Sequence, residues 1–323
     1  MNSNGRVPLK RGILPADSPG EFMRDCFISI GYIIIDDIIL PDGTRKLGVL
    51  GGGAPHAVMG MRVWTDQVGL VSGMGGDHAD EILSELDDYF YTKGMKVQSH
   101  LPTPRAWQVF DETGHREETF QTSQEGMLSL LPKPTELSEY YQNLRGVHLH
   151  CSPENVHKWV PPLRKLGCDI ILWEPHDEFC VPENRSLFQE NSKRVDIVSP
   201  NLREGRLLTE LEDPVDIVHR LIDYGAPVAV LRMGAEGSLV ASSQGELFEI
   251  PSYPVDHLVD VTGAGNAYCG GFIVGLHRES ALQKAGWYGA VSASFTLEQF
   301  GVLYNLSKLK DAQNRLAWYE QQA

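Results

Sequence analysis

The chain has 323 residues, 42% of them hydrophobic, and a formal net charge of −15 from 28 basic and 43 acidic residues. This length and composition suit one large α/β domain or two ordinary ones with a sizeable core. The acidic excess argues against a nonspecific nucleic-acid or anionic-membrane surface, so an anionic substrate must be held by local donors.

Cysteine usage and hydropathy indicate a cytoplasmic protein. Five scattered cysteines, with no Cys-x-x-Cys pair, predict reduced and mostly buried thiols. The N-terminus lacks the apolar core of a signal peptide, and no apolar run is long enough to span a membrane. We therefore expect a soluble protein that binds a small molecule rather than nucleic acid or membrane.

The first part of the chain predicts a loose lead-in, a strand and a hairpin. Residues 1–25 are polar and contain several prolines and glycines, which predicts a loose N-terminal segment before a single domain over residues 26–323. Residues 26–35 are apolar and β-branched and predict one buried strand, closed by two aspartates. Residues 38–50 hold a Pro-Asp-Gly-Thr turn between two extended stretches, which predicts a hairpin.

Helical and extended patterns alternate in the next segments. Residues 51–64 predict a glycine-led helix, and residues 68–72 predict a short strand. A helical spacing of apolar residues from Asp77 predicts a helix that ends at Gly94. Residues 105–121 alternate polar and apolar side chains, which predicts an exposed hairpin with one covered face.

The second half of the chain predicts a doubly wound parallel sheet, because strands and helices alternate. The expected strands are residues 146–150, 169–173, 195–198 and 228–231. The candidate helices between them are residues 153–166, 182–191, 203–211 and 214–224. An apolar stripe predicts an amphipathic C-terminal helix, and it consists of Leu309, Ala312, Leu316 and Tyr319.

The most informative segment is Asp-Val-Thr-Gly-Ala-Gly-Asn, from Asp260 to Asn266. The small and apolar residues that follow it predict a buried helix. Gly263 and Gly265 at the helix start let free backbone N–H groups approach an anion, and the positive end of the helix dipole points the same way. Thr262 either caps this turn or donates its hydroxyl to the anion.

Two later motifs each have a structural and a functional interpretation. Asn201 and Glu204 follow a strand and lie one helical turn apart, where they form either a capping box or a site for hydrated Mg²⁺ beside a nucleotide's phosphates. Arg232, Gly234 and Gly237 follow another strand, in a turn that suits an ordinary hairpin and would also suit a nucleotide lying across the sheet edge.

Two motifs near the N-terminus are equally open. Gly52 and Gly53 precede Ala-Pro-His56, and they form either a flexible turn or a close backbone approach to ligand hydroxyls. Asp36 either caps a turn or binds sugar hydroxyls at the carboxyl edge of the sheet, where ligands bind in open α/β folds.

Other motifs favour the structural interpretation. His148 and His150 share a strand face, and a packed or surface pair is expected there rather than a zinc site. A solvated loop rather than a metal site is expected for Glu174, His176, Asp177 and Glu178. No Gly-x-x-x-x-Gly-Lys-Ser/Thr occurs, and the late Gly-Ala-Gly lacks the third glycine of a dinucleotide fingerprint, so a Walker-type site and a dehydrogenase are set aside.

The order of these motifs resembles the PfkB (ribokinase-like) family of carbohydrate and nucleoside kinases over residues 26–302. The residues that carry the resemblance are Gly31 to Asp36, Gly52-Gly53 with Gly73 to Asp77, Asn201-x-x-Glu204, and Asp260-x-Thr262-Gly263-Ala264-Gly265. Residues 51–64 and 173–180 also look like the eukaryotic maintenance-of-killer branch, whose members share a Gly-Ala-Gly-Asn ending.

This resemblance implies an α/β/α sandwich with a β lid over residues 38–50 and 105–121. It implies ATP-dependent phosphoryl transfer to a hydroxyl of a sugar, polyol or nucleoside, with the backbone N–H groups of Ala264, Gly265 and Asn266 stabilising the phosphoryl group. The implied ligand contacts are Asp36, Gly52, Gly53 and His56 for substrate, Asn201, Thr262 and Arg232 to Gly237 for ATP, Asn201 and Glu204 for Mg²⁺, and Asp260 for a monovalent cation such as K⁺. The protein would be a monomer or a homodimer joined through its lid, with Trp107, Val109 and Phe110 as contacts if exposed.

Two departures from the family pattern matter. His56 stands where the family has an asparagine, and Asn266 stands at the position of the catalytic base. An amide orients a hydroxyl but does not accept its proton near neutral pH, and loss of a general base typically costs about 10²–10⁴-fold in rate. Two hypotheses follow: a slow kinase, made faster by Asn266→Asp, or a pseudo-kinase that binds nucleotide or metabolite as a scaffold or sensor.

Overall fold

A central sheet organises the structure, a computed structural model that describes residues 22–112 and 116–322. Within these residues the sheet has eight strands in the order β16-β15-β14-β13-β12-β11-β2-β5. Neighbours from β5 to β14 run parallel, and β14, β15 and β16 run antiparallel, so the sheet is mostly parallel as predicted. The strands are β2 (Phe27–Ile30), β5 (Val68–Val71), β11 (Gly146–His150), β12 (Ile170–Glu174), β13 (Ile197–Val198), β14 (Val228–Arg232), β15 (Ser238–Ser242) and β16 (Leu247–Ile250).

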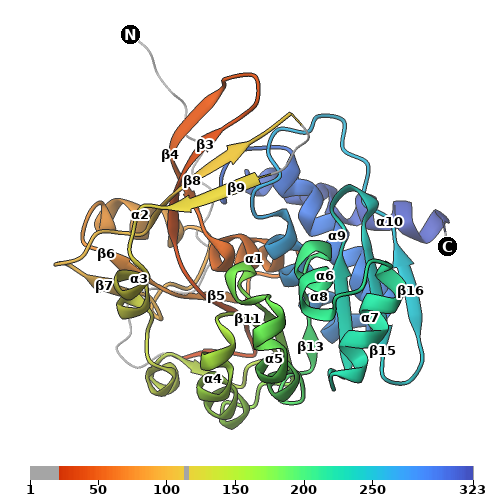
Figure 1. Cartoon of the computed structure of the whole chain (residues 1–323). Helices are drawn as coiled ribbons and strands as arrows, with labels where there is room; N and C mark the ends of the chain where they lie inside the picture. Colours follow the sequence, from red (N-terminus) through yellow and green to blue (C-terminus); the bar gives the residue numbers. More distant parts are fainter. Residues whose placement is uncertain (1–21, 113–115, 323) are drawn as a thin grey trace.

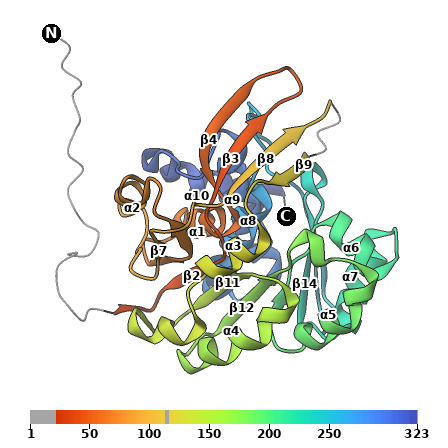
Figure 2. The ribbon, with the colours of Figure 1, turned by 60° about the vertical axis from the view of Figure 1, so that its left-hand side comes forward.

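Helices cover both faces of this sheet, which confirms the predicted three-layer arrangement (Figures 1 and 2). One layer contains α1 (Gly53–Arg62), α8 (Ala264–Glu279), α9 (Leu282–Leu297) and α10 (Ala312–Gln322). The other contains α4 (Pro153–Lys165), α5 (Arg185–Ser192), α6 (Leu202–Thr209) and α7 (Pro214–Asp223). Side chains alternate along a strand, so Leu172 of β12 packs into the first layer's core while Ile171 and Trp173 pack into the second.

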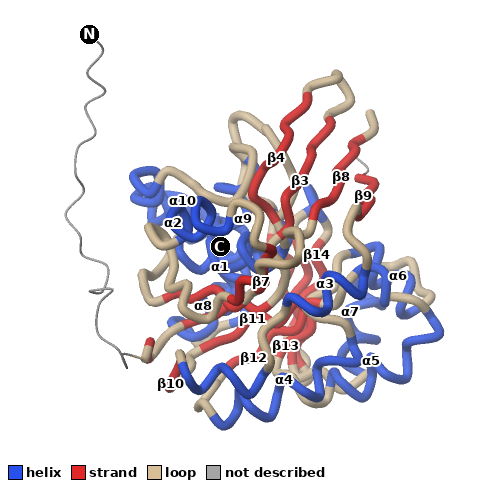
Figure 3. The backbone as a smooth tube through the Cα atoms, turned by 90° about the vertical axis from the view of Figure 1, so that its left-hand side faces the viewer, coloured by secondary structure: helices blue, strands red, loops and turns tan. Residues whose placement is uncertain are grey.

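A second, smaller sheet stands beside the central one (Figure 3). Among the described residues it has four strands in the order β4-β3-β8-β9, which are β3 (Ile34–Ile39), β4 (Arg45–Gly51), β8 (Arg105–Phe110) and β9 (Arg116–Phe120). We call this sheet the lid. It joins the two predicted hairpins, because β3 and β8 pair in parallel. Trp107 and Val109 are exposed on it, whereas Phe110 is buried and is therefore not a surface contact.

The predicted single strand over residues 26–35 was wrong. The chain forms β2, leaves the central sheet at Gly31, and enters the lid as β3. A Cβ on Gly31 would lie 3.1 Å from the Cβ of Ala54, so helix α1 packs directly on this crossing point. Both strands are buried, so hydrophobicity did not reveal the break. Asp36 consequently lies inside a lid strand instead of closing a strand of the central sheet.

Several other elements differ from prediction. Helix α2 (Ala79–Leu86) ends well before Gly94, because the chain turns to bring Tyr91 into a bridge with Gly69. Helix α9 was not predicted, since most of it is buried and its apolar residues form no single stripe. The remaining elements are β1 (Met23–Arg24), β6 (Gly73–Gly75), β7 (Lys96–Gln98), β10 (Tyr141–Gln142), α3 (Gln124–Leu130) and the 3₁₀ turns η1 (Pro134–Glu139), η2 (Asp177–Phe179), η3 (Pro182–Asn184), η4 (Gly234–Glu236) and η5 (Leu306–Asp311).

Smaller expectations are confirmed. The C-terminal stripe is divided between η5 and α10, and three of its members are buried, namely Ala312, Leu316 and Tyr319. All five cysteines are free and buried. None of the described helices combines the length and the apolarity that crossing a membrane requires.

Candidate active site

A cleft of about 1540 Å³ lies between the lid and the carboxyl ends of the parallel strands. This is the edge at which open α/β sheets bind ligands. The lid contributes Asp36, Gln108 and Arg116 to its walls, and the strand ends contribute His150, Glu174 and Arg232. Every site residue named from the sequence lines this cleft except Asp260, which is buried behind it.

The start of helix α8 forms the predicted anion-binding turn. Among the described residues, the backbone N–H groups of Gly265 and Asn266 have no hydrogen-bond partner. The N–H of Ala264 donates to the carbonyl oxygen of Val261 at 3.3 Å, so the turn offers two fully free amides rather than three. These amides and the helix dipole together favour a bound anion such as a phosphoryl group.

Glycine is required at two positions of this turn. Gly263 has φ +76°, and a Cβ on it would lie 2.1 Å from the ring of His56. A Cβ on Gly265 would lie 2.2 Å from Nη1 of Arg232. His56 is buried, and the guanidinium of Arg232 is held by its ion pair with Glu174. The two glycines therefore let the backbone of the turn pack directly against His56 and Arg232.

Thr262 stabilises this turn from within. Its backbone N–H and its hydroxyl both donate to Oδ1 of Asp260, at 3.0 Å and 2.8 Å. The N-cap position belongs to Gly263, so Thr262 is not the cap of α8. Its hydroxyl proton is used inside the turn, which favours a structural role over donation to an anion. Burial raises the pKa of Asp260, and the two hydrogen bonds from Thr262 oppose that effect.

Asp36 is placed by its lid neighbours at one end of the cleft. It is 2% exposed, and the side-chain amide of Gln108 donates to its Oδ1 at 2.9 Å. The same amide donates to Glu118 at 2.6 Å. Burial raises the pKa of Asp36 to about 7, although the hydrogen bond from Gln108 opposes this effect. A buried carboxylate in this environment is stabilised by a ligand hydroxyl that donates a hydrogen bond to it, as the sugar-binding interpretation requires.

His56 lines the cleft and lies against the phosphate turn at Gly263. It is 2% exposed, and neither ring nitrogen has a hydrogen-bond partner among the described residues. Burial lowers its pKa to about 4, so the ring is neutral near pH 7. Buried polar atoms are normally hydrogen-bonded, so two unpartnered nitrogens beside the cleft make His56 a candidate ligand contact.

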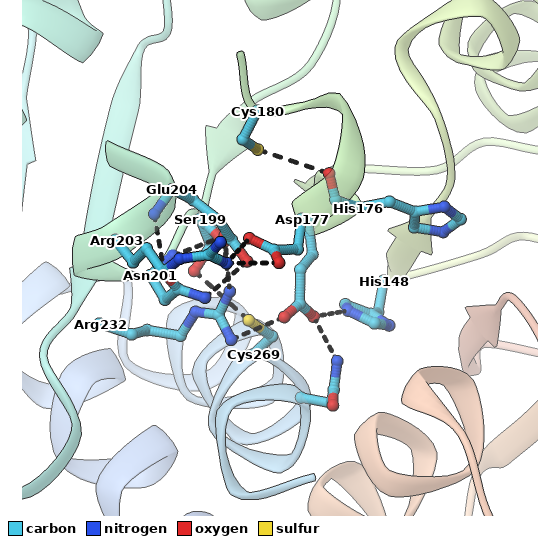
Figure 4. A network of polar contacts seen from close by, with 12 residues as sticks. His148, His176, Asp177, Cys180, Ser199, Asn201, Arg203, Glu204, Arg232 and Cys269 are labelled. Carbon is cyan, nitrogen blue, oxygen red and sulfur yellow. Dashed lines mark hydrogen bonds and ion pairs between the residues drawn. The ribbon is translucent and has the colours of Figure 1, made fainter. Parts of the chain in front are cut away.

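Glu174 connects three parts of the site, among them Arg232 and His148, which Figure 4 labels. Its two carboxylate oxygens contact Arg232 Nη1 at 2.6 Å and His148 Nε2 at 2.6 Å. The side-chain amide of Asn266 donates to the same oxygen as His148, at 2.9 Å. Glu174 is 4% exposed, so the predicted solvated loop was wrong at this residue. It ends strand β12, and the neighbouring strands β11 and β13 shield it.

The histidine pair is packed, as predicted, but His148 does have a carboxylate neighbour. His148, Glu174 and Cys269 offer potential ligand atoms within 4.8 Å of one another. The guanidinium of Arg232 already neutralises Glu174 there, and burial raises the pKa of the Cys269 thiol. A cation would have to compete with Arg232 and would meet a protonated thiol, so this cluster does not fit a metal ion.

Asn201 and Glu204 form the capping box that the sequence allowed. The N–H of Asn201 donates to Glu204 at 2.7 Å, and the N–H of Glu204 donates to Asn201 Oδ1 at 2.9 Å. Burial raises the pKa of Glu204 to about 7, with Arg232 opposing it at 3.8 Å. A carboxylate that Arg232 neutralises only in part, beside an amide oxygen in the cleft, fits hydrated Mg²⁺. The capping box and the Mg²⁺ site are therefore compatible interpretations.

Figure 4 shows the adjacent ion pair between Arg203 and Asp177, with contacts of 2.7 Å and 2.6 Å.

The turn after β14 follows the hairpin interpretation, since β14 and β15 pair antiparallel. Gly234 and Gly237 line the cleft, where a nucleotide can approach their backbone. Arg232 also lines the cleft, and much of its guanidinium is engaged by the protein. Its guanidinium is 11% exposed, binds Glu174, and donates to the carbonyl oxygen of Ser199 at 2.8 Å.

Comparison with known proteins agrees with this geometry. Residues 27–309 match the family described as pfkB family carbohydrate kinase. The chain belongs to this family. It is 29% identical to a cytidine kinase of Thermococcus kodakarensis over 85% of this chain and 96% of that protein. It is 25% identical to Protein MAK32 of Saccharomyces cerevisiae over 86% of each chain, in keeping with the eukaryotic branch. A protein from E. coli assigned as ribokinase II, solved with ATP and Mg²⁺, has the same fold with a TM-score of 0.71 at 20% identity, over 90% of this chain and 99% of that one.

Sequence reasoning did not assign several cleft residues of this pfkB-family chain to the site. Glu174 and His150 received only a structural interpretation, although both end neighbouring parallel strands, and that position was a usable signal. Gln108 and Arg116 belong to the lid, where nothing in an alternating hairpin pattern indicates which side chains face the cleft.

Proposed function

We propose that the protein transfers a phosphoryl group from ATP to a hydroxyl of a small sugar or nucleoside. The observation that supports this most directly is the pair of free amides of Gly265 and Asn266, two residues that line the cleft. Such donors stabilise negative charge that develops on a transferring phosphoryl group. Family membership supports the same class of reaction.

We assign ATP to the end of the cleft that lies away from the lid. Gly234 and Gly237 line that end, with exposed Leu258 close to the phosphate turn. Apolar side chains of α9 close it, namely Ala290, Ala293 and Leu297. An apolar slot beside backbone donors suits an adenine ring with its phosphates directed to the start of α8.

We assign the acceptor to the lid end and favour a nucleoside among the possible acceptors. Tyr32 and Ile34 pack with Ala106 into a small apolar cluster there, against which Met127 and Leu131 lie. A bare sugar offers little apolar surface to such a wall, whereas a nucleobase offers a flat apolar face. Asp36 and His56 remain for the ribose hydroxyls. The similarity to a cytidine kinase supports this choice.

In this scheme the acceptor oxygen forms a bond to the γ-phosphorus while the bond from that phosphorus to the departing ADP oxygen breaks. The acceptor hydroxyl donates a hydrogen bond to Asn266, which cannot take its proton. The proton moves instead to an oxygen of the transferred phosphoryl group and is then released to water, consistent with a loose transition state. Mg²⁺ held by Asn201 and Glu204 would neutralise phosphate charge. We further assign a monovalent cation such as K⁺ to the loop of Asp260.

A second candidate function rests on Asn266 itself. Because this residue is an amide, no base occupies the position, and its nitrogen is bound to Glu174 at 2.9 Å. A protein of this kind could bind nucleotide or metabolite and act as a scaffold or sensor without turnover.

The decisive experiment is a single-turnover assay. Stoichiometric protein is mixed with γ-labelled ATP, Mg²⁺ and a panel of nucleosides and sugars, and products are quenched and separated. We expect labelled nucleoside monophosphate at a slow rate. The assay is repeated with K⁺ replaced by a bulky ammonium ion, which should slow the reaction. Binding of ATP without any labelled product across the whole panel would exclude the kinase and leave the scaffold.

A further inference from the structure

The side chain of Asn266 is fixed in one orientation. Its Nδ2 atom donates to Oε2 of Glu174 at 2.9 Å. An ionised carboxylate only accepts hydrogen bonds, so the amide must present its nitrogen to Glu174 and keep its oxygen for another partner. Asn266 lines the cleft, where the acceptor hydroxyl is assigned.

Glu174 is held in its ionised form by groups on the central sheet. Burial alone would raise its pKa, but Arg232 and the hydrogen bond from His148 outweigh burial and lower that pKa below its ordinary value. Behind His148, its Nδ1 atom lies 2.8 Å from the hydroxyl of Ser29. Such a fully partnered buried carboxylate keeps its charge and its position.

We propose that Glu174 is a positioning residue that aims the amide oxygen of Asn266 at the acceptor hydroxyl, and that it prevents a side chain at position 266 from acting as an ionised base. This inference rests on the proposed function and extends it. It changes the expectation from sequence, which was that Asn266→Asp alone would accelerate the reaction.

The reason is electrostatic. A carboxyl group introduced at position 266 would lie about 3 Å from Oε2 of Glu174, and two carboxylates at that distance cannot both ionise at ordinary pH. Arg232 and His148 stabilise the charge on Glu174, so the introduced carboxyl takes up the proton. In that form it donates to Glu174, as the amide does, and it cannot accept a proton from substrate.

Other charged groups around Glu174 do not change this result. The facing titratable groups are Arg232 on β14, His148 and His150 on β11, His176 beyond β12, Cys269 on α8 and Glu204 on α6. Burial lowers the pKa of both His150 and His176, and it raises the pKa of the Cys269 thiol. All of these groups stay in place in each variant, so the variants differ only in the groups at positions 174 and 266.

The test uses Asn266→Asp, Glu174→Gln and the double variant, which moves the negative charge from position 174 to position 266. For Asn266→Asp we expect no gain in kcat near neutral pH and an increase in kcat at higher pH. For the double variant we expect a kcat at neutral pH about 10²-fold above that of the parent, because the base is now ionised. Glu174→Gln alone should lower kcat about tenfold and change the KM for ATP little, since the amide is aimed less firmly.

A measurement without turnover separates this inference from the proposed function. Infrared difference spectra between about pH 5 and about pH 8 detect the protonated carboxyl of Asn266→Asp, whose ordinary pKa is about 3.9. A matched control is Asn314→Asp, because Asn314 also donates to a carboxylate, that of Asp311 at 3.0 Å, but on the surface. Asp36 and Glu204, whose pKa values burial raises to about 7, titrate in this window in every protein, so the spectrum of the parent is subtracted from that of each variant. We expect an additional titrating acid band for Asn266→Asp and none for the control.

The outcomes are distinct. If the introduced carboxyl is already ionised at about pH 5, as in the control, or if Asn266→Asp matches the double variant in kcat at neutral pH, Glu174 has no such role. If the acid band appears but no protein turns over any acceptor, the pairing stands and the kinase function is lost. Asn266→Asp is nearly isosteric, so its titration decides the matter even if Glu174→Gln does not fold.

Discussion

The guanidinium of Arg232 lies against Gly265, such that a Cβ on the glycine would sit 2.2 Å from Nη1. Arg232 cannot move away, because the same nitrogen contacts Glu174 at 2.6 Å in a buried ion pair. The free amide of Gly265 is thus held in place by a side chain of the central sheet. This contact links the phosphate turn to the charge network beneath it.

The first prediction concerns this contact. Gly265→Ala should displace the turn from its position and lower kcat about 10²-fold, the usual cost of a lost oxyanion-type donor. The measurement is steady-state kinetics with the acceptor found in the single-turnover assay. Gly245→Ala is the control, since its φ of +91° makes this substitution strain the backbone of a turn outside the cleft, with no atom near the Cβ position. Equal effects of the two substitutions would contradict a special role for Gly265.

A second prediction follows from the pKa of Asp36, which burial raises from 3.8 to about 7. Between these values the folded protein binds more protons than the unfolded chain, so its free energy of unfolding falls as pH rises through this window. Asp36→Asn removes this decrease in the free energy of unfolding. The Tm of the variant relative to the parent should therefore increase from about pH 5 to about pH 8 without ligand.

The control for Asp36 is Asp42→Asn. The backbone N–H of Thr44 holds the pKa of Asp42 below 3.8, so this substitution adds no pH dependence in the same window. A constant Tm difference for Asp36→Asn across the window would show that Asp36 is ionised in the folded protein.

The third prediction concerns His56, whose two ring nitrogens have no partner among the described residues. His56→Phe keeps a flat ring and removes both nitrogens. We expect the KM of the acceptor to rise about tenfold, the value of one buried hydrogen bond, with little change in the KM of ATP. His157→Phe on the exposed side of α4 is the control. A selective effect on ATP would place His56 outside the acceptor site.

The fourth prediction concerns Arg116 on the lid. Arg116 lines the cleft, and its charge acts on Asp36, His56 and Asp260. Arg116→Gln should lower kcat/KM about tenfold and reduce its dependence on salt, because a charge facing the phosphates is lost. Arg45→Gln, on the other lid hairpin and exposed, should leave both unchanged. An unchanged salt dependence in Arg116→Gln would show that this cation does not face the phosphates.

Much of the fold could be predicted because its patterns are local. Short apolar strands alternating with capped helices predicted the parallel sheet, and the bounds of α4 and α7 differ from prediction by one residue at most. The break at Gly31 and the helix α9 were missed for one reason: both lie among residues buried on every side, where hydrophobicity has no period.

The sequence alone determined the phosphate turn. Its two glycines, its helix-forming continuation and its chemistry all lie within seven consecutive residues, and the conformation they require is set by neighbouring peptide units. It also determined that position 266 is an amide. Only the tertiary structure decided what that amide contacts. Glu174 lies 92 residues away in the chain, and it reaches Asn266 because parallel strands end at one edge of the sheet, where α8 begins. A charge pattern formed by side chains from separate strands has no local signature, so it becomes visible only once the strands are assembled.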